Sequence, residues 1–526
     1  MTAPPAAPQK ITYTSANVDL EAFHRAFDAA LADVRARMGQ RHPLHIGGKA
    51  VETGASPVVD RSPIDTEQVL GHFTAAGPAE VDQAMRAAHS AQRAWAARPW
   101  QERVAILRRA AALIRERKYT LAAVMSVEVG KNRMESMGDA EESADLVDYY
   151  CGQVEEQNGF TRDMKRMTPI EKNTELLRPF GVFACVAPFN FPLALSTGMS
   201  SAALVTGNAV VYKPAEDTPW TGMELHDVYR DAGVPAGVFN YLSGRGREMG
   251  DALWSHPLCD GVVFTGSREV GMRIFHGLSQ RWVKPCLMEL GGKNAVTVTR
   301  TADLDMAAEG VMRSTFGLQG QKCSATSRVY VDRTVAAPFL EKLLARTRAI
   351  AIGDVTRKDS WFGPVINQKA VDRYGKAVER ARREGKVLLG GERLHGPGLE
   401  RGFFVAPTVA ELPLTSELFL EELFLPFLSL GVVDSFDQAI AESNRADYGL
   451  TAGLYTADRG EIARWFDEIE AGVCYVNKRS GATTGAWPGA QPFCGWKGSG
   501  ATGKGGCGPW YVQQFAREQS RTLVEE

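Results

Sequence analysis

The fold is decided by GVFACVA (181–187), NAVVYKP (208–214), GVFNYLSG (237–244), GVVFTGS (261–267) and NAVTVTR (294–300). Each apolar run is bounded by Gly, Pro, Asn or Asp, and helical stretches separate one run from the next. Strands that alternate with helices predict a mostly parallel, doubly wound α/β sheet. The ligand site of such a sheet lies at the carboxyl ends of its strands.

The same alternation continues on both sides of this series. SRVYVDR (327–333), FLSLGVV (427–433) and GVCYVNK (472–478) predict a second α/β domain. Upstream, residues 101–126 place Val104, Leu107, Ala111 and Ile114 at helical spacing, which predicts an amphipathic helix. The last segment, 510–526, has little to bury alone, so we expect it to pair with another subunit.

Composition narrows the class of protein. The 526 residues exceed the size of one usual core, so two or three domains are expected. A net charge of −2 with 23% charged residues leaves no electrostatic footprint for nucleic acid. No apolar run resembles a signal peptide or could span a bilayer, so a soluble, cytoplasmic protein without a membrane partner is expected.

The eight cysteines are scattered, without a CxxC pair or a Cys/His cluster of zinc spacing. This predicts reduced thiols and no bound metal. A lone cysteine is most often a small buried hydrophobe, so a functional role must be argued from its neighbours.

Three glycine-rich segments could hold phosphates. Residues 244–250 have the wrong last spacing for a dinucleotide fingerprint and could equally be a strand-to-helix turn. In 264–271, Gly266 and Ser267 precede a helical stretch and could receive a pyrophosphate, or Ser267 could be a helix cap without a ligand. Residues 498–505 nearly match a P-loop but lack the Ser or Thr that holds magnesium, which excludes a nucleotide triphosphatase.

Four further motifs carry chemistry: PFNFP (188–192), YKPAE (212–216), MELGGKN (288–294) and GQKCSATSR (320–328). A cysteine between small residues can attack a carbonyl, because its thiolate is strongly nucleophilic near neutral pH. Together and in this order the motifs resemble those of the aldehyde dehydrogenase superfamily. The resemblance implies a Rossmann-type NAD-binding domain (1–156 and 180–289), a catalytic α/β domain (290–504) and a small β oligomerisation extension (157–179 and 505–526). It also implies a homo-oligomer, a dimer or higher.

The resemblance assigns three catalytic residues. Cys323 is the nucleophile that forms a thiohemiacetal and then a thioester, and the Asn190 side chain with the Cys323 N–H meets the oxyanion. Glu289 is the general base that activates water. Glu289 could instead form a surface salt bridge, but Met288 and Leu290 beside it suggest a partly dry setting. Because relatives that transfer the acyl group to CoA lack this base, hydrolysis to the free acid is expected.

Cofactor binding is implied in the same way. NAD would meet Lys213 and Glu216 at the adenosine ribose, Gly266 and Ser267 near the pyrophosphate, and Glu422 with Phe424 near the nicotinamide ribose. The carboxylate of Glu216 favours a 2′-hydroxyl over a 2′-phosphate, hence NAD over NADP. Without its motif, Lys213 would be read as a solvated surface lysine. Two positions depart from the family pattern, Leu425 and Cys494, where glycines are usual, and both put local loop geometry in doubt.

Within the superfamily the chain is most similar to the 1-pyrroline-5-carboxylate, or glutamate-γ-semialdehyde, dehydrogenases. The matching stretches include EVGKN (128–132), GDAEESADLVDYY (138–150) and TGAWPGAQPF (484–493). The resemblance implies oxidation of L-glutamate γ-semialdehyde to L-glutamate in proline catabolism. The implied substrate contacts are Ser324, Gly485 and Ala486 at the α-carboxylate, Phe191 and Phe493 along the aliphatic chain, and Glu142 at the ammonium. Gly485 and Ala486 could also be a plain turn, and Glu142 a solvated helix residue. A dehydrogenase for another small semialdehyde and a catalytically silent protein of this fold remain the alternatives.

Overall fold

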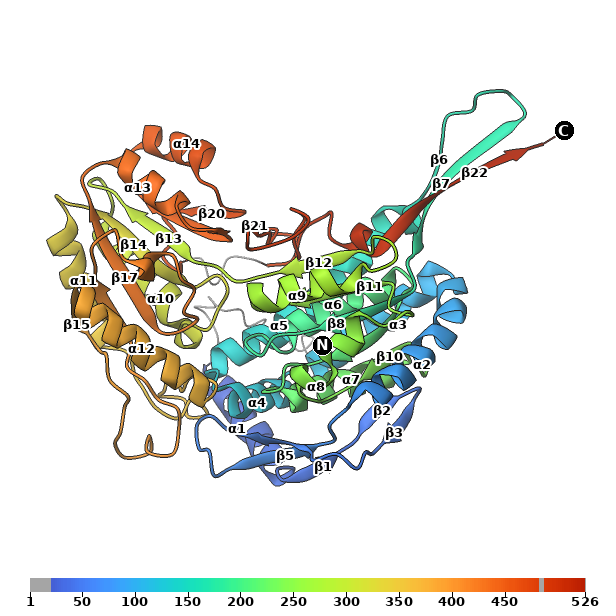
Figure 1. Cartoon of the computed structure of the whole chain (residues 1–526), viewed down its shortest axis with the longest axis horizontal. Coiled ribbons are helices and arrows are strands. Elements are labelled where there is room, and N and C mark those ends of the chain that lie inside the picture. Colours follow the sequence, from blue (N-terminus) through green and yellow to red (C-terminus); the bar gives the residue numbers. More distant parts are fainter. Residues whose placement is uncertain (1–19, 482–486, 526) are drawn as a thin grey trace, which may run out of the picture.

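The computed structural model describes residues 20–481 and 487–525. Two seven-stranded sheets form the body of the molecule, and a three-stranded arm projects from it (Figure 1). Within the described residues, no helix is long and apolar enough to cross a membrane.

The first sheet has the strand order β12-β11-β8-β9-β10-β2-β3. Strands β8 to β12 run parallel, whereas β2 and β3 add an antiparallel edge. The strands are β2 (Leu44–Ile46), β3 (Lys49–Val51), β8 (Val182–Val186), β9 (Ala209–Lys213), β10 (Phe239–Tyr241), β11 (Gly261–Thr265) and β12 (Cys286–Glu289). Four of the five opening runs thus form neighbouring strands of one sheet, as expected of a doubly wound fold.

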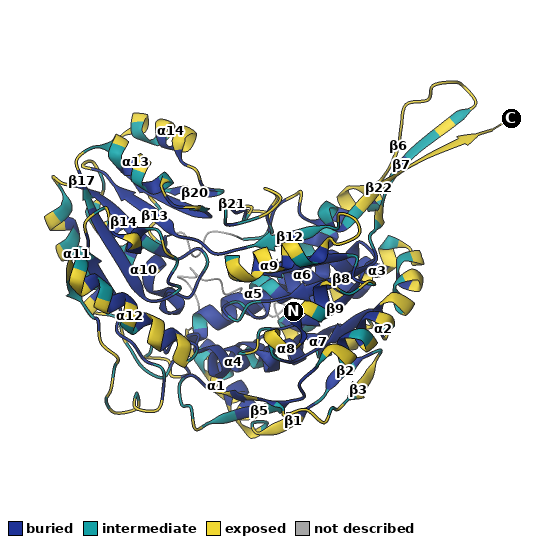
Figure 2. Ribbon diagram, in the orientation of Figure 1, coloured by how far each residue is buried: buried dark blue, intermediate teal, exposed yellow. Residues whose placement is uncertain are grey.

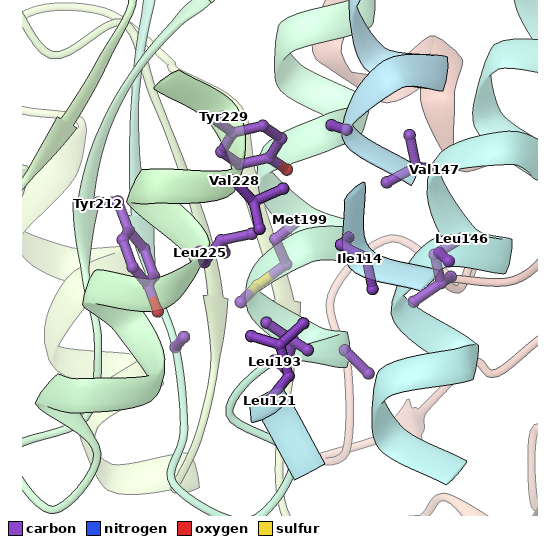
Figure 3. Close-up of a cluster of buried hydrophobic side chains, with 14 of the residues drawn as sticks. Ile114, Leu121, Leu146, Val147, Leu193, Met199, Tyr212, Leu225, Val228 and Tyr229 are labelled. Atoms are coloured by element: carbon purple, nitrogen blue, oxygen red, sulfur yellow. The ribbon is translucent and has the colours of Figure 1, made fainter. Parts of the chain in front are cut away.

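Helices cover both faces of this sheet because alternate strand residues point to opposite sides. Phe183 and Cys185 pack into one apolar cluster, whereas Val182 and Ala184 pack into another. The first cluster lies under α3 (Trp100–Glu116), α5 (Arg133–Glu156), α6 (Ala194–Val205) and α7 (Pro219–Ala232), and part of it is drawn in Figure 3. The second lies under α2 (Pro78–Ala97), α8 (Gly246–Trp254) and α9 (Arg268–Leu278).

The helix predicted over 101–126 is two helices, so this expectation was wrong in its length. A break at Arg117 (φ −94°, ψ 7°) separates α3 from α4 (Lys118–Val129). Residues Leu121 to Val129 of α4 are all buried, whereas α3 keeps an exposed face. The break therefore lets the second half of the segment turn into the core.

The second sheet has the order β15-β16-β17-β14-β13-β19-β20 and is parallel except for β15. Its strands are β13 (Asn294–Val298), β14 (Thr326–Asp332), β15 (Lys386–Leu389), β16 (Thr408–Glu411), β17 (Phe427–Val433), β19 (Thr451–Tyr455) and β20 (Val473–Val476). Its helices are α10 (Leu304–Phe316), α11 (Ala336–Arg348), α12 (Gln368–Glu384), α13 (Phe436–Asn444) and α14 (Arg459–Glu468). The run at 294–300 follows the first series in sequence but pairs with β14 and β19 here.

The arm consists of β6 (Thr161–Asp163), β7 (Glu171–Pro179) and β22 (Ala516–Val524). The C-terminal segment was expected to pair with another subunit, but β22 pairs with β7 of its own chain over nine residues. β22 is nevertheless an edge strand, and nearly all of its residues are exposed (Figure 2). Its outer edge therefore still offers unpaired backbone groups.

The remaining elements are one helix and two small sheets. They are α1 (Leu20–Ala36), a sheet of β1 (Gln40–His42), β5 (Val69–Phe73) and β4 (Val58–Arg61), and a pair of β18 (Tyr448–Gly449) with β21 (Trp496–Lys497). Short 3-10 turns are η1 (Asn158–Phe160), η2 (Gly317–Gly320), η3 (Glu417–Phe419) and η5 (Val512–Phe515).

Candidate active site

Cys323 lies on the loop between η2 and β14, in the second sheet's domain. The Asn294 side chain fixes this loop, because its Nδ2 donates to the Cys323 carbonyl at 2.7 Å and to the Ala325 carbonyl at 2.8 Å. Leu318 and Gln319, just before, adopt left-handed backbone conformations (φ 46° and 54°). Such strained residues cluster at functional sites, where surrounding contacts hold them in place.

Two cavities meet at Cys323. One is a small cavity of about 90 Å³, here called the aldehyde cavity, and the other is a cleft of about 600 Å³, here called the cofactor cleft. Cys323 lines both. The sulfur thus stands where a small ligand and a much larger one can approach it from different sides.

The aldehyde cavity brings together most of the predicted substrate residues. Glu142, Phe191, Ser324 and Phe493 line it together with Cys323 and Glu289. Sequence reasoning missed other lining residues, which are Leu146, Tyr150, Ala194, Leu195, Gly198, Met199, Thr265, Gly506, Cys507 and Tyr511. Helical spacing could have found two of them, because Leu146 and Tyr150 follow Glu142 at intervals of four residues on α5.

Asn190 lies after β8, is 2% exposed and lines the cofactor cleft beside Cys323. Its Oδ1 accepts a hydrogen bond from the Phe191 N–H at 3.1 Å. Its Nδ2 donates to no group in the described part of the chain. The amide therefore keeps a donor for a ligand, as a preorganised oxyanion site requires.

Glu289 ends β12, and its main chain is held on both sides. Its carbonyl accepts from the Gly266 N–H, and it forms a β-bridge with Gly500. Its Oε2 is buried without a hydrogen-bond partner among the described residues. Burial raises the pKa of Glu289 well above the ordinary value, although a hydrogen bond from the Gly495 backbone lowers it. A carboxyl whose pKa is raised in this way can accept a proton nearer neutral pH than an ordinary one.

Glu289 also lines a second small cavity of about 20 Å³ behind it, formed with the 500–504 loop and Cys494. A polar space of that size has room for about one water molecule. The near-P-loop segment therefore packs behind the candidate base, and it leads into a loop and η5.

The thiol of Cys323 is not activated by its surroundings. Burial, together with the nearby carboxylates Glu289 and Glu422, raises its pKa to about 12. A thiolate must therefore form with the help of a base or of positive charge brought by a ligand.

The cofactor cleft contains four of the six predicted NAD contacts: Gly266, Ser267, Glu422 and Phe424. Ser267 caps α9, because its Oγ accepts from the Val270 N–H. A Cβ at position 266 would lie 2.5 Å from the Phe264 ring, so glycine is needed there. Burial raises the pKa of Glu422 to about 7, and its Oε1 accepts from the Gly292 N–H at 2.8 Å.

The chemistry of the lining residues shows whether a dinucleotide fits this cleft. The N-terminus of α9 suits a pyrophosphate, and the carboxylate of Glu422 suits ribose hydroxyls. Arg268 and Arg373, which also line the cleft, add positive charge and were not anticipated from the sequence. The residues present therefore fit NAD.

Lys213 and Glu216 do not line the cleft, although Ala215 between them does. Lys213 is buried at the end of β9, where its Nζ donates to the Pro214 carbonyl. Burial lowers its pKa to about 8, and Glu216 opposes this shift. The alternative reading of Lys213 as a solvated lysine was wrong, and Glu216 is exposed.

The two departures from the family pattern fit their surroundings. Leu425 is 4% exposed in the apolar cluster of the second sheet and does not adopt a positive φ, so it needs no glycine. Cys494 is buried and lines the cavity behind Glu289. Gly485 and Ala486 lie outside the described residues, so their predicted contacts stay predictions.

Comparison with known proteins agrees with this arrangement. The model of the aldehyde dehydrogenase family matches residues 51–520. The chain is 37% identical over 512 residues to 1-pyrroline-5-carboxylate dehydrogenase 1 of Halalkalibacterium halodurans, with 96% of this chain and 97% of that protein covered. It is 35% identical over 511 residues to 1-pyrroline-5-carboxylate dehydrogenase of Bacillus subtilis, covering 95% and 96%. The crystal structure of 1-pyrroline-5-carboxylate dehydrogenase from Thermus with bound NAD matches with a TM-score of 0.92 and 36% identity over all of both chains.

The chain therefore belongs to the aldehyde dehydrogenase family. The relatives just described are all 1-pyrroline-5-carboxylate dehydrogenases, which confirms the finer resemblance inferred from the sequence.

Proposed function

We propose that this protein oxidises L-glutamate γ-semialdehyde to L-glutamate with NAD and water, through a thioester on Cys323. The observation that carries the proposal is that Cys323 lines both the aldehyde cavity and the cofactor cleft. A single sulfur can then hold the substrate carbon on one side while hydride leaves to the other. The names of the relatives support the choice of substrate.

The reaction begins when the Cys323 thiolate adds to the aldehyde carbon, forming a C–S bond and placing negative charge on the oxygen. The Asn190 Nδ2 and the Cys323 backbone N–H donate to this oxygen. When bound, NAD⁺ supplies the hydride acceptor and a positively charged ring. Loss of hydride from the substrate carbon leaves a thioester on Cys323.

Glu289 completes the cycle by accepting a proton from water as that water attacks the thioester carbon. The C–S bond then breaks, the acid leaves and the thiolate is restored. Because Glu289 lines the same cavity as Cys323, it can serve a water positioned there. The residues thus favour hydrolysis over transfer to another thiol.

Selectivity for an amino-acid aldehyde is assigned to the other residues that line the aldehyde cavity. Phe191 and Phe493 supply apolar walls, Ser324 a hydroxyl, and Glu142 a carboxylate for the ammonium group. Gly485 and Ala486 are proposed to hold the α-carboxylate. A few such polar contacts are enough to separate this substrate from simple aldehydes.

We propose that each of the three parts expected from the sequence has its own role in this function. Residues 1–156 and 180–289 would bind NAD, 290–504 would carry the nucleophile, and 157–179 with 505–526 would form the oligomerisation extension. The arm has exposed apolar residues at Met164, Met167, Ile170, Leu523 and Val524. Exposed apolar residues on the arm, with Leu523 and Val524 on its open edge strand, support assembly into a homo-oligomer, a dimer or higher.

A cytoplasmic location is part of the proposal. All eight cysteines are free thiols. Free thiols without disulfides are typical of reducing compartments.

The test is NADH formation at saturating NAD across a panel of aldehydes, with Cys323→Ala as the control. We expect glutamate γ-semialdehyde to give the highest kcat/KM and the control to be inactive. Equal turnover of succinate semialdehyde would favour a dehydrogenase for another small semialdehyde. No turnover of any aldehyde would favour a catalytically silent protein of this fold.

A further inference from the structure

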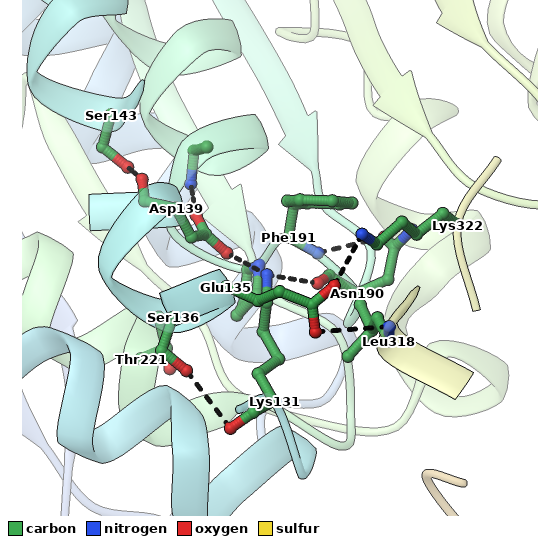
Figure 4. A network of polar contacts seen from close by, with 12 residues as sticks. Lys131, Glu135, Ser136, Asp139, Ser143, Asn190, Phe191, Thr221, Leu318 and Lys322 are labelled. Atoms are coloured by element: carbon green, nitrogen blue, oxygen red, sulfur yellow. Dashed lines mark hydrogen bonds and ion pairs between the residues drawn. The ribbon is translucent and has the colours of Figure 1, made fainter. Parts of the chain in front are cut away.

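Lys131 lies in the short link between α4 and α5, outside both cavities, and its side chain is fully buried. Its Nζ donates to Asp139 Oδ2 at 2.7 Å and to the Asn190 carbonyl at 2.9 Å (Figure 4). The same ammonium lies 3.9 Å from the centre of the Phe191 ring. One buried charge therefore contacts both the residue proposed to bind the oxyanion and a wall of the aldehyde cavity.

Asp139, the ion-pair partner of Lys131, fixes the other end of the segment that begins at Asn190. Its Oδ1 accepts from the Ala194 N–H at 2.7 Å, where α6 begins. The segment from Asn190 to Ala194 is thus fixed at one end by Lys131 and at the other by its ion-pair partner. A rigid main chain leaves the Asn190 side chain few alternative positions.

The first turn of α5 also supports the loop that carries the nucleophile. Glu135 accepts from Lys322 Nζ at 2.7 Å and from the Leu318 N–H at 3.2 Å. Lys322 directly precedes Cys323, and Leu318 is one of the two strained residues before it. The oxyanion donor and the nucleophile loop are therefore held by two residues close together in sequence, Lys131 just before α5 and Glu135 in its first turn.

Stability alone does not explain such a pair. Replacing a buried ion pair with apolar residues is often neutral or stabilising, because desolvation of both charges offsets their attraction. The pair at Lys131 is wholly buried, with both side chains 0% exposed. Its contacts with Asn190 and Phe191 point instead to a role in geometry.

We propose that Lys131 is a positioning residue for the oxidation: its ammonium fixes the Asn190 main chain and the Phe191 ring so that the Asn190 amide meets the oxyanion formed at Cys323. This inference rests on the function proposed above.

The first test compares Lys131→Met with a matched control, Lys118→Met. Lys118 forms a similar buried ion pair with Glu141 at 2.7 Å, also between α4 and α5, and that pair contacts neither Asn190 nor the Cys323 loop. We expect Lys131→Met to lower kcat about 100-fold, the usual effect of a misplaced catalytic group. The KM for NAD should stay unchanged, and Lys118→Met should keep the wild-type kcat.

The second test separates positioning from simple charge balance. Lys131→Met leaves Asp139 unpaired, so the double variant Lys131→Met with Asp139→Asn removes the buried charge that remains. We expect the double variant to regain the thermal stability lost in Lys131→Met while kcat stays low. If kcat recovers together with stability, Lys131 only neutralises Asp139 and the proposal is wrong.

Alkylation of Cys323 by iodoacetamide gives a readout that does not depend on the oxyanion. We expect the same alkylation rate in wild type and Lys131→Met, because the nucleophile loop keeps its own contacts with Glu135. A Lys131→Met enzyme with wild-type kcat, next to an active wild type, would overturn this inference alone. A wild type that oxidises no aldehyde would overturn the proposed function and this inference with it.

Discussion

The two spaces that meet at Cys323 differ in size and in the chemistry of their walls. The aldehyde cavity, of about 90 Å³, is lined largely by apolar side chains with a carboxylate at Glu142 and another at Glu289. The cofactor cleft, of about 600 Å³, carries Arg268 and Arg373 beside several carboxylates. The small space therefore suits an aldehyde shielded from water, and the large one suits a larger charged ligand beside it.

This difference predicts that variants on the two sides fail in different ways. A change in the aldehyde cavity should alter chemistry or aldehyde selection, and one in the cofactor cleft should alter NAD binding. Cys323 lines both spaces, as does Thr265, and we expect a change at Cys323 to affect the reaction of both ligands.

The largest effect is expected from Glu289→Gln on the cavity side. Steady-state turnover should fall about 1000-fold, because an amide cannot accept the proton of the attacking water. The first turnover should survive as a burst of NADH equal to the enzyme concentration. Stopped-flow absorbance measures both phases, and loss of the burst would show that Glu289 acts before the thioester forms.

The pH profile gives the control for this variant. In wild type, the deacylation rate should rise with pH through the raised pKa of Glu289, because the ionised carboxylate is the base. Glu289→Gln should lack that ascending limb. An unchanged limb in the variant would assign the base to another group.

A smaller effect is expected from Glu422→Gln on the cleft side. The KM for NAD should rise about tenfold, the cost of weakening one hydrogen bond to a charged group. The KM for the aldehyde should stay the same. Initial-rate kinetics with each substrate varied in turn measure both KM values. A raised KM for the aldehyde with an unchanged KM for NAD would place Glu422 in the aldehyde site.

Glu142→Gln tests the carboxylate that we propose meets the substrate ammonium in the aldehyde cavity. We expect the KM for glutamate γ-semialdehyde to rise by a factor of about five, because a neutral amide pairs less well with an ammonium. An aldehyde without an amino group should be oxidised as before. If the KM rises equally for both substrates, Glu142 shapes the cavity and does not recognise the ammonium.

The smallest expected effect is on stability. The folded-state pKa of Glu289 is raised above its ordinary 4.5, so ionisation of this buried carboxyl costs stability as pH rises above that value. Glu289→Gln removes the cost, and its Tm should exceed that of wild type by about 2 °C at high pH. Scanning calorimetry should find the difference shrinking toward pH 4.5, and a constant difference would refute the assignment.

Much of this architecture could be predicted from the sequence, because strand runs and motifs are local signals. The runs at 181–187 and 208–214 became adjacent strands, and Cys323, Glu289 and Phe493 came together in one cavity. Local signals failed where contacts between segments distant in sequence determine the structure. The run at 294–300 joined the second sheet, and Arg117 broke a helix that its periodicity alone continued.

The missed site residues show the same limit. Tyr511 and Cys507 reach the aldehyde cavity only because the chain returns to α5, where the Tyr150 hydroxyl accepts from the Cys507 N–H. Lys131 stands in EVGKN, a stretch that supported the resemblance, yet its contact with Asn190 joins residues 59 positions apart. Such contacts depend on tertiary packing, which spacing along the chain does not encode.

We propose that Cys323, where the aldehyde cavity and the cofactor cleft meet, carries the acyl group as a thioester. The most direct measurement is mass spectrometry of Glu289→Gln, quenched with acid after one turnover with NAD and glutamate γ-semialdehyde. We expect a γ-glutamyl mass on the peptide containing Cys323, present only when NAD is added. NADH formed without that adduct, or with the acyl group on another cysteine, would contradict it.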